Sequence, residues 1–266
     1  MGLQKGFTGL ARITRALSDD IYFRFQNADM PREQGINSYL PSYGGKDLWR
    51  VISPGVGTIN GRISLLLCED QADELYSLAR DYSEFTLDLC YYRKSSRTFL
   101  ECHVKSLSFS CKAGEIVGVN MEIVATGDSK GTLSFRNTST QKLVTWDKTG
   151  ITGAAPSDTA DDDIQSFSYN IENNVVPVRT ANRLFPYEIK QGIQAVTGNV
   201  VWFDNVRERR ITTTAEYNAL DVTDATFRIG NLTIVHGIAH HWSYKTPLSV
   251  ELVVTTLEWS RVEDIS

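Results

Sequence analysis

Hydrophobic and polar residues alternate along much of the chain, as expected for half-buried β-strands. The alternation is clearest at residues 164–172 and 249–259. Short polar segments separate most of the alternating stretches and favour antiparallel pairing. The predicted strands fall into two groups, 21–26, 58–67, 86–92, 98–109 and 116–126, then 164–172, 196–203, 224–229, 232–244 and 249–259.

Helical periodicity is clear only at residues 69–82, where Leu75, Leu78 and Tyr82 lie on one apolar stripe. Acidic residues occupy the first turn of this predicted helix, where the helix dipole favours negative charge. A second helix, poorer in leucine, is expected around 216–220 in the second group.

The two groups of predicted strands show the same order of elements. The matching landmarks are Asn27, Pro31 and Gly61 in the first group and Asn173, Pro177 and Gly198 in the second. A period of about 140 residues is too long for a solenoid and favours two tandem copies of one domain. We therefore expect a mainly β protein with two tandem antiparallel β-sandwich or barrel domains, each with one flanking α-helix.

The expected domain organisation has four parts. Residues 1–20 form an N-terminal arm, with Leu10, Ile13 and Leu17 at helical spacing. Residues 129–163 form a linker rich in Gly, Pro and Asp, with a small hairpin predicted between 133–136 and 142–146. The two β domains occupy residues 21–128 and 164–266, and each is long enough to bury its own core.

Residues 28–57 form a long segment rich in turn-forming residues. Such loops in compact domains are usually functional or disordered. Its aromatic residues suit contact with a neighbouring subunit, whereas an Ω-loop folded on its own domain is the alternative. The candidate assembly residues are Tyr39, Tyr43, Trp49, Pro31, Pro177 and Tyr187.

Composition limits the classes of partner. The net charge of −5 argues against tight binding of nucleic acid through phosphate contacts. No apolar run is long enough for a membrane span or a signal peptide, so we expect no membrane partner. The cysteines lack the paired spacing of a zinc site, and we expect them to be reduced, buried strand residues, namely Cys68, Cys90, Cys102 and Cys111.

Catalytic signatures are not found in the sequence. There is no nucleophile elbow and no phosphate-binding glycine loop. His236, His240 and His241 fall in one predicted strand and invite a metal-site hypothesis, but no second group of ligands accompanies them. We therefore expect no enzyme activity, no cofactor and no catalytic, cofactor-binding or metal residues.

The second half contains the segments SFSYNIENNVVP at 166–177, YEIKQG at 187–192 and VTGNV at 196–200. Together these segments resemble bacteriophage tail tube proteins. The resemblance is best over residues 165–260 and weaker over 21–127. It implies a β-sandwich or small barrel with a flanking helix, whose sheets join between subunits into a ring around a lumen.

The resemblance further implies a structural virion protein that forms rings of a tail tube, or of a tube-like tip such as a baseplate initiator or hub. A trimer of duplicated chains would make a pseudo-hexameric ring, and a hexamer is the alternative. The implied partners are the chain itself, adjacent tube or baseplate proteins, the tape measure and a sheath, with DNA passing unbound through the channel. The protein would be made in the host cytoplasm and reside in the virion tail.

A different class of function stays open from the residues themselves. A two-domain β-sandwich that binds carbohydrate or protein would explain exposed aromatic residues such as Trp49 equally well. The two hypotheses differ in the assembly they predict. A tube protein forms ring oligomers, whereas a binding module remains a monomer or small dimer.

Overall fold

The computed structural model describes residues 9–16, 20–39, 51–91, 96–133, 142–153, 164–180, 185–205, 221–245 and 252–261. Fourteen of the strands in these ranges join into one continuous sheet system, and two more form a separate small ladder. One α-helix, α1 (Ala72–Arg80), accompanies them within the described ranges. The prediction of a mainly β fold is confirmed.

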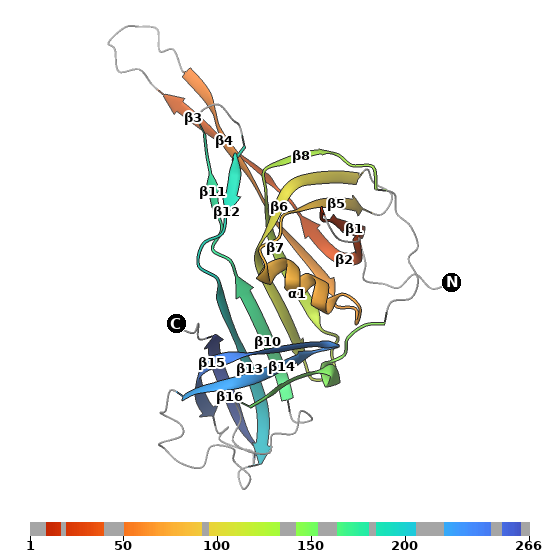
Figure 1. The fold of residues 1–266 in the computed structure, drawn as a ribbon, viewed down its shortest axis with the longest axis vertical. Helices are drawn as coiled ribbons and strands as arrows, with labels where there is room; N and C mark the ends of the chain where they lie inside the picture. Colours follow the sequence, from red (N-terminus) through yellow and green to blue (C-terminus); the bar gives the residue numbers. More distant parts are fainter. Residues whose placement is uncertain are drawn as a thin grey trace.

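The first half of the chain forms a closed barrel (Figure 1). Its strands pair in a circle, in the order β4, β2, β1, β5, β6, β7 and back to β4. Helix α1 packs on β6 and buries Leu75, Leu78 and Ala79. The strands are β1 (Gly9–Thr14), β2 (Ile21–Asp29), β4 (Val51–Leu66), β5 (Phe85–Tyr91), β6 (Ser96–Lys112) and β7 (Gly118–Ala125), with β8 (Gly127–Lys130) added beside the start of β6.

Strand β1 corrects the prediction of a helical N-terminal arm. It lies between β2 and β5, and Leu10, Ala11 and Ile13 are all buried. Successive side chains of a strand point to opposite faces, so the burial of both Leu10 and Ala11 means that both faces of β1 are covered. The helical spacing of Leu10 and Ile13 therefore does not reflect one apolar helix face. Ala11, which lies between them, is fully buried as well, as expected in a strand that is buried on both faces.

The second half of the chain is built from an open series of paired strands in the order β10, β13, β16, β15, β14, β9. Strand β9 also contacts β10, although no ladder is described between these two. Residues 206–220, which include the predicted second helix, lie outside the described ranges. The strands are β9 (Thr149–Thr152), β10 (Ile164–Glu172), β13 (Ala195–Asn205), β14 (Asp221–Ile229), β15 (Leu232–Lys245) and β16 (Leu252–Arg261).

The order of pairing is the same in the two halves. β2, β4, β7, β6, β5 and β1 pair in succession in the first half, and β10, β13, β16, β15, β14 and β9 do so in the second. One detail of register also agrees between the halves. The β2–β4 ladder has a bulge between Phe25 and Asn27, and the β10–β13 ladder has one between Ile164 and Ser166.

Gly61 and Gly198 occupy matching positions in these ladders. A Cβ on Gly61 would lie 2.8 Å from the carbonyl oxygen of Asp29, and one on Gly198 would lie 2.2 Å from that of Ser168. Counting from the bulges, Asn27 corresponds to Ser166. The predicted match of Asn27 with Asn173 is therefore wrong, whereas that of Gly61 with Gly198 agrees with the register.

One hydrophobic core runs through both halves of the molecule. It includes Phe23, Phe109 and Leu107 of the first half and Trp202 and Phe227 of the second, all with at most 1% of their surface exposed. All four cysteines are free and buried, as predicted. Among the described residues, no helix has the length and hydrophobicity needed to cross a membrane.

The segment between the halves also differs from its prediction. Leu143 pairs with Cys68 and Thr145 pairs with Ile116. Residues 134–136 and the turn of the hairpin predicted between 133–136 and 142–146 lie outside the described residues. Val144, which was expected in an exposed linker, has no exposed surface and fills a position in the core.

Candidate assembly site

The two halves are joined by a direct ladder between β6 and β10. Residues 106–112 of β6 pair antiparallel with residues 172–166 of β10. The ladder continues past both ends, since the N–H of Asn173 donates to the carbonyl of Lys105 and the N–H of Ala113 donates to that of Gln165. We call this ladder the internal junction.

The length of β6 creates the internal junction. β6 has 17 residues, whereas its neighbour β5 has 7 and last pairs at Cys102. Beyond that point the same edge of β6 would present unpaired N–H and C=O groups, which strongly favour another strand. β10 takes this edge while β7 pairs with the opposite one, so residues 106–110 lie centrally in the sheet.

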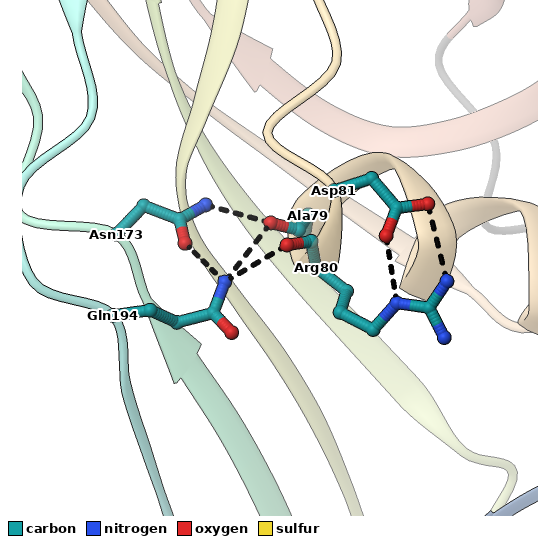
Figure 2. A network of polar contacts seen from close by, with 5 residues as sticks. All are labelled: Ala79, Arg80, Asp81, Asn173 and Gln194. Carbon is teal, nitrogen blue, oxygen red and sulfur yellow. Dashed lines mark hydrogen bonds and ion pairs between the residues drawn. The ribbon is translucent and has the colours of Figure 1, made fainter. Parts of the chain in front are cut away.

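A buried polar network fixes the end of the internal junction (Figure 2). Asn173, directly after β10, has no exposed surface. Its side-chain Nδ2 donates to the carbonyl of Ala79 at 2.9 Å and to that of Val104 at 2.9 Å. Its Oδ1 accepts from Nε2 of Gln194 at 2.8 Å, so every hydrogen-bonding atom of the amide is used.

The same network completes the C-terminus of α1. Helices end with carbonyls that have no partner within the helix. Here the carbonyls of Ser77 and Leu78 accept from Asp81 and Ser83 in the chain that follows. Those of Ala79 and Arg80 accept from Asn173 and from Gln194, the latter at 3.1 Å. Amides from the second half thus satisfy the helix end of the first half.

Aromatic side chains pack across the internal junction. Tyr169 of β10 meets Tyr76 of α1 edge to face, with ring centroids 6.2 Å apart. Its hydroxyl lies 3.1 Å from Nε2 of His236, and Phe227 and Trp259 pack against its ring. Burial raises the pKa of Tyr169 and lowers that of His236, so both side chains favour their neutral forms.

Residues 142–148, called here the connecting segment, contact both halves. The N–H of Val144 donates to Leu67 and its carbonyl accepts from Val117, both in the first half. In the second half, the N–H of Gly230 donates to Lys148. A Cβ on Gly230 would lie 2.9 Å from Cγ2 of Val144, so the two elements are in close contact.

Charged groups hold the connecting segment on the first half. Glu69 forms ion pairs with Lys142 at 3.1 Å and with Lys148 at 3.4 Å. The hydrogen bond from Lys142 lowers the pKa of Glu69 most, and Lys148 contributes further. Both ion pairs are solvent-exposed on the lysine side, so each adds little to stability and serves mainly to position the segment.

Two β-hairpins project toward the same end of the molecule (Figure 1). The larger one consists of β3 (Arg32–Tyr39) and the first half of β4. Its ladder pairs residues 32–39 with residues 51–59, so most of it lies within residues 28–57 and the Ω-loop alternative is wrong for the described part of that segment. The smaller one consists of β11 (Val176–Val178) and β12 (Glu188–Lys190).

The sequence-predicted assembly residues are divided between these hairpins. Pro31 lies between β2 and β3, and Tyr39 ends β3, whereas Tyr43 and Trp49 lie outside the described residues. Pro177 pairs with Ile189 in the smaller hairpin, next to Tyr187, whose surface is 54% exposed. Their role in assembly stays a prediction.

Sequence reasoning missed the residues that join the halves. Asn173 was noted only as a landmark, although a polar residue directly after an alternating strand is a signal for a capping or junction role. Gln194 carries no such signal, because its partners are backbone carbonyls far away in sequence. Val144 was assigned to a linker because it lies in a segment of mixed composition.

Comparison with protein families gives a match to the model described as phage tail tube protein, over residues 36–203. The matched region begins in β3 and ends in β13, and therefore includes α1, the internal junction and the connecting segment. No curated protein matches the chain in a separate comparison. A match to this family indicates a structural component of the virion tail that assembles with other tail proteins. Because the matched residues make up more than half of the chain, the protein belongs to the phage tail tube protein family.

Proposed function

We propose that three copies of the chain close into a ring with pseudo-sixfold symmetry around a channel for DNA. Each chain contributes two tube-like units to this ring. The observation that carries the proposal is the internal junction, in which two units with the same order of strand pairing are joined edge to edge.

Domain duplication is the first step of the proposal. It is supported by the equal order of pairing, by the bulges at Phe25 and Ile164, and by the matching positions of Gly61 and Gly198. On this view β1 corresponds to β9. The first unit then runs from β1 to β8 and the second from β9 to β16, which shifts both proposed domains toward the N-terminus of the predicted ranges.

Ring closure is the second step. A head-to-tail contact, in which one edge of a unit pairs with a different edge of the next unit, generates a closed ring or an open helix, depending on the rotation between neighbours. The internal junction already sets the rotation between two units within a chain. If the same junction forms between chains, a ring of three chains contains three junctions within chains and three between them. The alternative is a ring of six chains, in which each chain contributes one unit.

We also propose how the surfaces of the ring are used in the tail. The two projecting hairpins would contact the next ring of the tube, or a baseplate protein if the chain forms a tip ring or tube initiator. A tape measure and a sheath would contact the inside and outside. The net charge of −5 suits a channel that DNA crosses without binding, since like charges repel. The chain would be made in the host cytoplasm and incorporated into the tail.

The test is the mass and shape of the purified chain. The chain has a mass of 29.8 kDa, so light scattering separates a monomer from a trimer and from a hexamer. Negative-stain electron microscopy of the same sample shows whether the particles are rings with a central hole. A trimeric ring supports the proposal. If the rings also stack into tubes, the chain is favoured as the repeated subunit of the tail tube over a protein that forms a single ring at the tail tip.

A compact monomer at high protein concentration would contradict the ring. It would favour the two-domain binding module, and screens with glycans would come next. A hexameric ring would contradict the trimer while keeping the role in the tube.

A further inference from the structure

A single row of small, uncharged polar side chains crosses both halves of the chain. The row lies on seven strands that pair in succession, β2, β4, β7, β6, β10, β13 and β16, and each member lies directly opposite the next in the ladders. Beside it, β15 adds Ala239 opposite Ser260. We call the seven residues the polar row and the eight strands the belt. From β2 to β16 the polar row consists of Asn27, Ser64, Asn120, Ser108, Asn170, Thr197 and Ser260.

The other face of the belt is apolar. One position along each strand from the polar row, six residues that again lie opposite one another are buried, with at most 8% of their surface exposed. They are Ala28, Ile63, Met121, Leu107, Ile171 and Val196. On this face Tyr76 of α1 and Phe227 of β14 pack against Tyr169, and β1 and β5 close the first barrel around the same core. Helix α1, β1, β5 and β14 therefore lie on one side of the belt and the polar row on the other.

The polar row presents hydroxyl and amide groups to solvent. Four of its members are exposed and three are half-buried. The hydroxyl of Ser64 donates to Oδ1 of Asn120 at 2.6 Å. In the second half the same contact recurs two residues along β10 from the row, where the hydroxyl of Ser168 donates to Oδ1 of Asn199 at 3.0 Å. The two halves thus carry the same surface chemistry on this face.

Two cations on the same strands are paired. Arg62 on β4 and Lys105 on β6 both form ion pairs with Glu122 on β7, the latter at 3.4 Å. The hydrogen bond from Arg62 lowers the pKa of Glu122 most, so this carboxylate keeps its charge at neutral pH. These groups offset one another in part, and the polar row itself contributes no charge.

We propose that the polar row lines the channel of the ring and is the surface past which duplex DNA moves. This inference rests on the proposed ring and assigns the inner wall of its channel. Two arguments carry it, the size of the belt and the chemistry of the row.

The size of the belt decides which of its faces lies inside. Strands lie about 4.8 Å apart, so three chains with eight belt strands each enclose a circumference of about 115 Å and a diameter of about 37 Å, which strand tilt widens further. If α1 and the core strands lay inside this circle, they would take about 10 Å from each side and close the opening to a duplex. With these elements outside, the opening admits a duplex and the polar row faces it.

The uncharged row suits the transit of DNA. Proteins hold duplexes mainly through Lys and Arg contacts to phosphates, which release counterions. Hydroxyl and amide groups carry no charge and release none. A dense acidic lining would instead repel the phosphates. The polar row does neither, so DNA passes it without being held or repelled.

A lysine in the polar row, combined with DNA of two topologies, tests the proposal. A closed ring takes up a duplex only over a free end, so a ring that holds DNA inside retains linear duplex and not a covalently closed circle of the same sequence. Asn120→Lys adds one cation per chain to the polar row. We expect assembled rings of this variant at low salt to retain linear duplex at least tenfold more than the circle, and wild-type rings to retain neither.

The matched control is Ser77→Lys, which adds the same charge on α1, on the other side of the belt. Its rings should bind linear and circular DNA alike, because a cation outside the channel contacts both. Equal retention of the two DNAs by Asn120→Lys rings, including retention of neither, overturns the placement of the row in the channel. Wild-type rings that retain linear duplex as strongly as the variant overturn transit past an indifferent surface.

A label gives a second test that does not depend on DNA. Thr197→Cys adds an exposed thiol, whereas the four native cysteines are buried. A gold cluster coupled to this thiol should appear in the central hole of the ring in electron micrographs, and one coupled to Ser77→Cys at the outer rim. A Thr197→Cys label at the outer rim overturns the inference, leaves the ring intact and assigns the row to contact with a surrounding protein. A chain that stays monomeric overturns both the inference and the proposed function.

Discussion

The buried side-chain amide of Asn173 lies 2.9 Å from the carbonyl oxygen of Ala79 and joins the end of β10 to the end of α1. The two residues belong to different halves of the chain. Helix α1 therefore ends on a hydrogen bond from the other half, and the internal junction is specified by a polar contact as well as by strand pairing. Such contacts stabilise one arrangement because a buried carbonyl without a donor is costly.

The first prediction concerns this contact. Asn173→Ala removes the side-chain donor from the buried carbonyl of Val104 and leaves that of Ala79 with only the 3.5 Å contact from Nε2 of Gln194. We expect a loss of about 1–3 kcal/mol in the free energy of unfolding. Urea denaturation measures it. The control is Asn120→Ala on the exposed face of β7, which should change the stability by less than about 0.5 kcal/mol. Equal effects of the two changes would contradict the role of Asn173.

The second prediction concerns Gly198. A Cβ there would lie 2.2 Å from the Ser168 carbonyl oxygen and 2.5 Å from Cζ2 of the buried Trp259. Gly198→Ala should cost about 1–3 kcal/mol, because neither the backbone nor the packed indole ring can move away freely. Gly118→Ala is the matched control in another strand, where the nearest atom is 3.7 Å away. Thermal unfolding of both variants would show the difference, and a fully stable Gly198→Ala variant would refute the close approach.

The third prediction concerns acid. Burial lowers the pKa of His103 and of His236, whereas the unfolded chain has the ordinary histidine pKa of about 6.5. Between the two values the unfolded chain binds more protons than the folded one, so stability falls as the pH falls. We expect full stability above about pH 7.5 and a decline below about 6.5.

The His103→Phe variant provides the check on this pH dependence. Phenylalanine keeps an aromatic ring against Tyr82, whose ring stacks on His103 at 4.4 Å, but it does not titrate. Unfolding measured from pH 5 to 8 should show a smaller decline in this variant than in the wild type. An unchanged decline would mean that other groups cause the acid sensitivity.

The fourth prediction concerns the place of β1 in the barrel. Arg12 on β1 forms an ion pair with Asp88 on β5 at 2.6 Å, and the aspartate side chain is only 3% exposed. Arg12→Ala leaves this carboxylate buried with the Thr98 hydroxyl as a remaining partner. We expect a loss of about 3 kcal/mol, since breaking a buried pair is costly.

The control for this ion pair is Arg62→Ala, which removes an exposed arginine from Glu122 on neighbouring strands. It should cost less than about 1 kcal/mol. Chemical denaturation of both variants measures the two losses in the free energy of unfolding. Similar small losses would indicate that β1 contributes little to the barrel.

Sequence patterns predicted the elements that bury one face. The alternation at 164–172 gave β10 with its observed bounds, and the stripe of Leu75 and Leu78 gave α1 within a few residues. Local periodicity succeeds there because one face of each element meets the core and the other does not. The resemblance of the second half to tail tube proteins agrees with the family match.

Features that depend on contacts between distant segments could not be predicted in the same way. β1 buries side chains on both of its faces, including the neighbours Leu10 and Ala11, so its sequence shows no period of two. Asn27 and Asn173 share a local motif but differ in register, because register depends on the bulges in the ladders. The side-chain amide of Gln194 contacts the carbonyl of Arg80, which is 114 residues away in the sequence. Local sequence patterns cannot predict a contact between residues so far apart.

The unequal hairpins have a consequence for how rings can stack. β3 has eight residues, whereas β11 and β12 have three each, so the two units present projections of different length. In the proposed ring these projections would alternate. A neighbouring ring could then dock in only three rotational settings instead of six, and each ring would pass a defined angular position to the next along the tail.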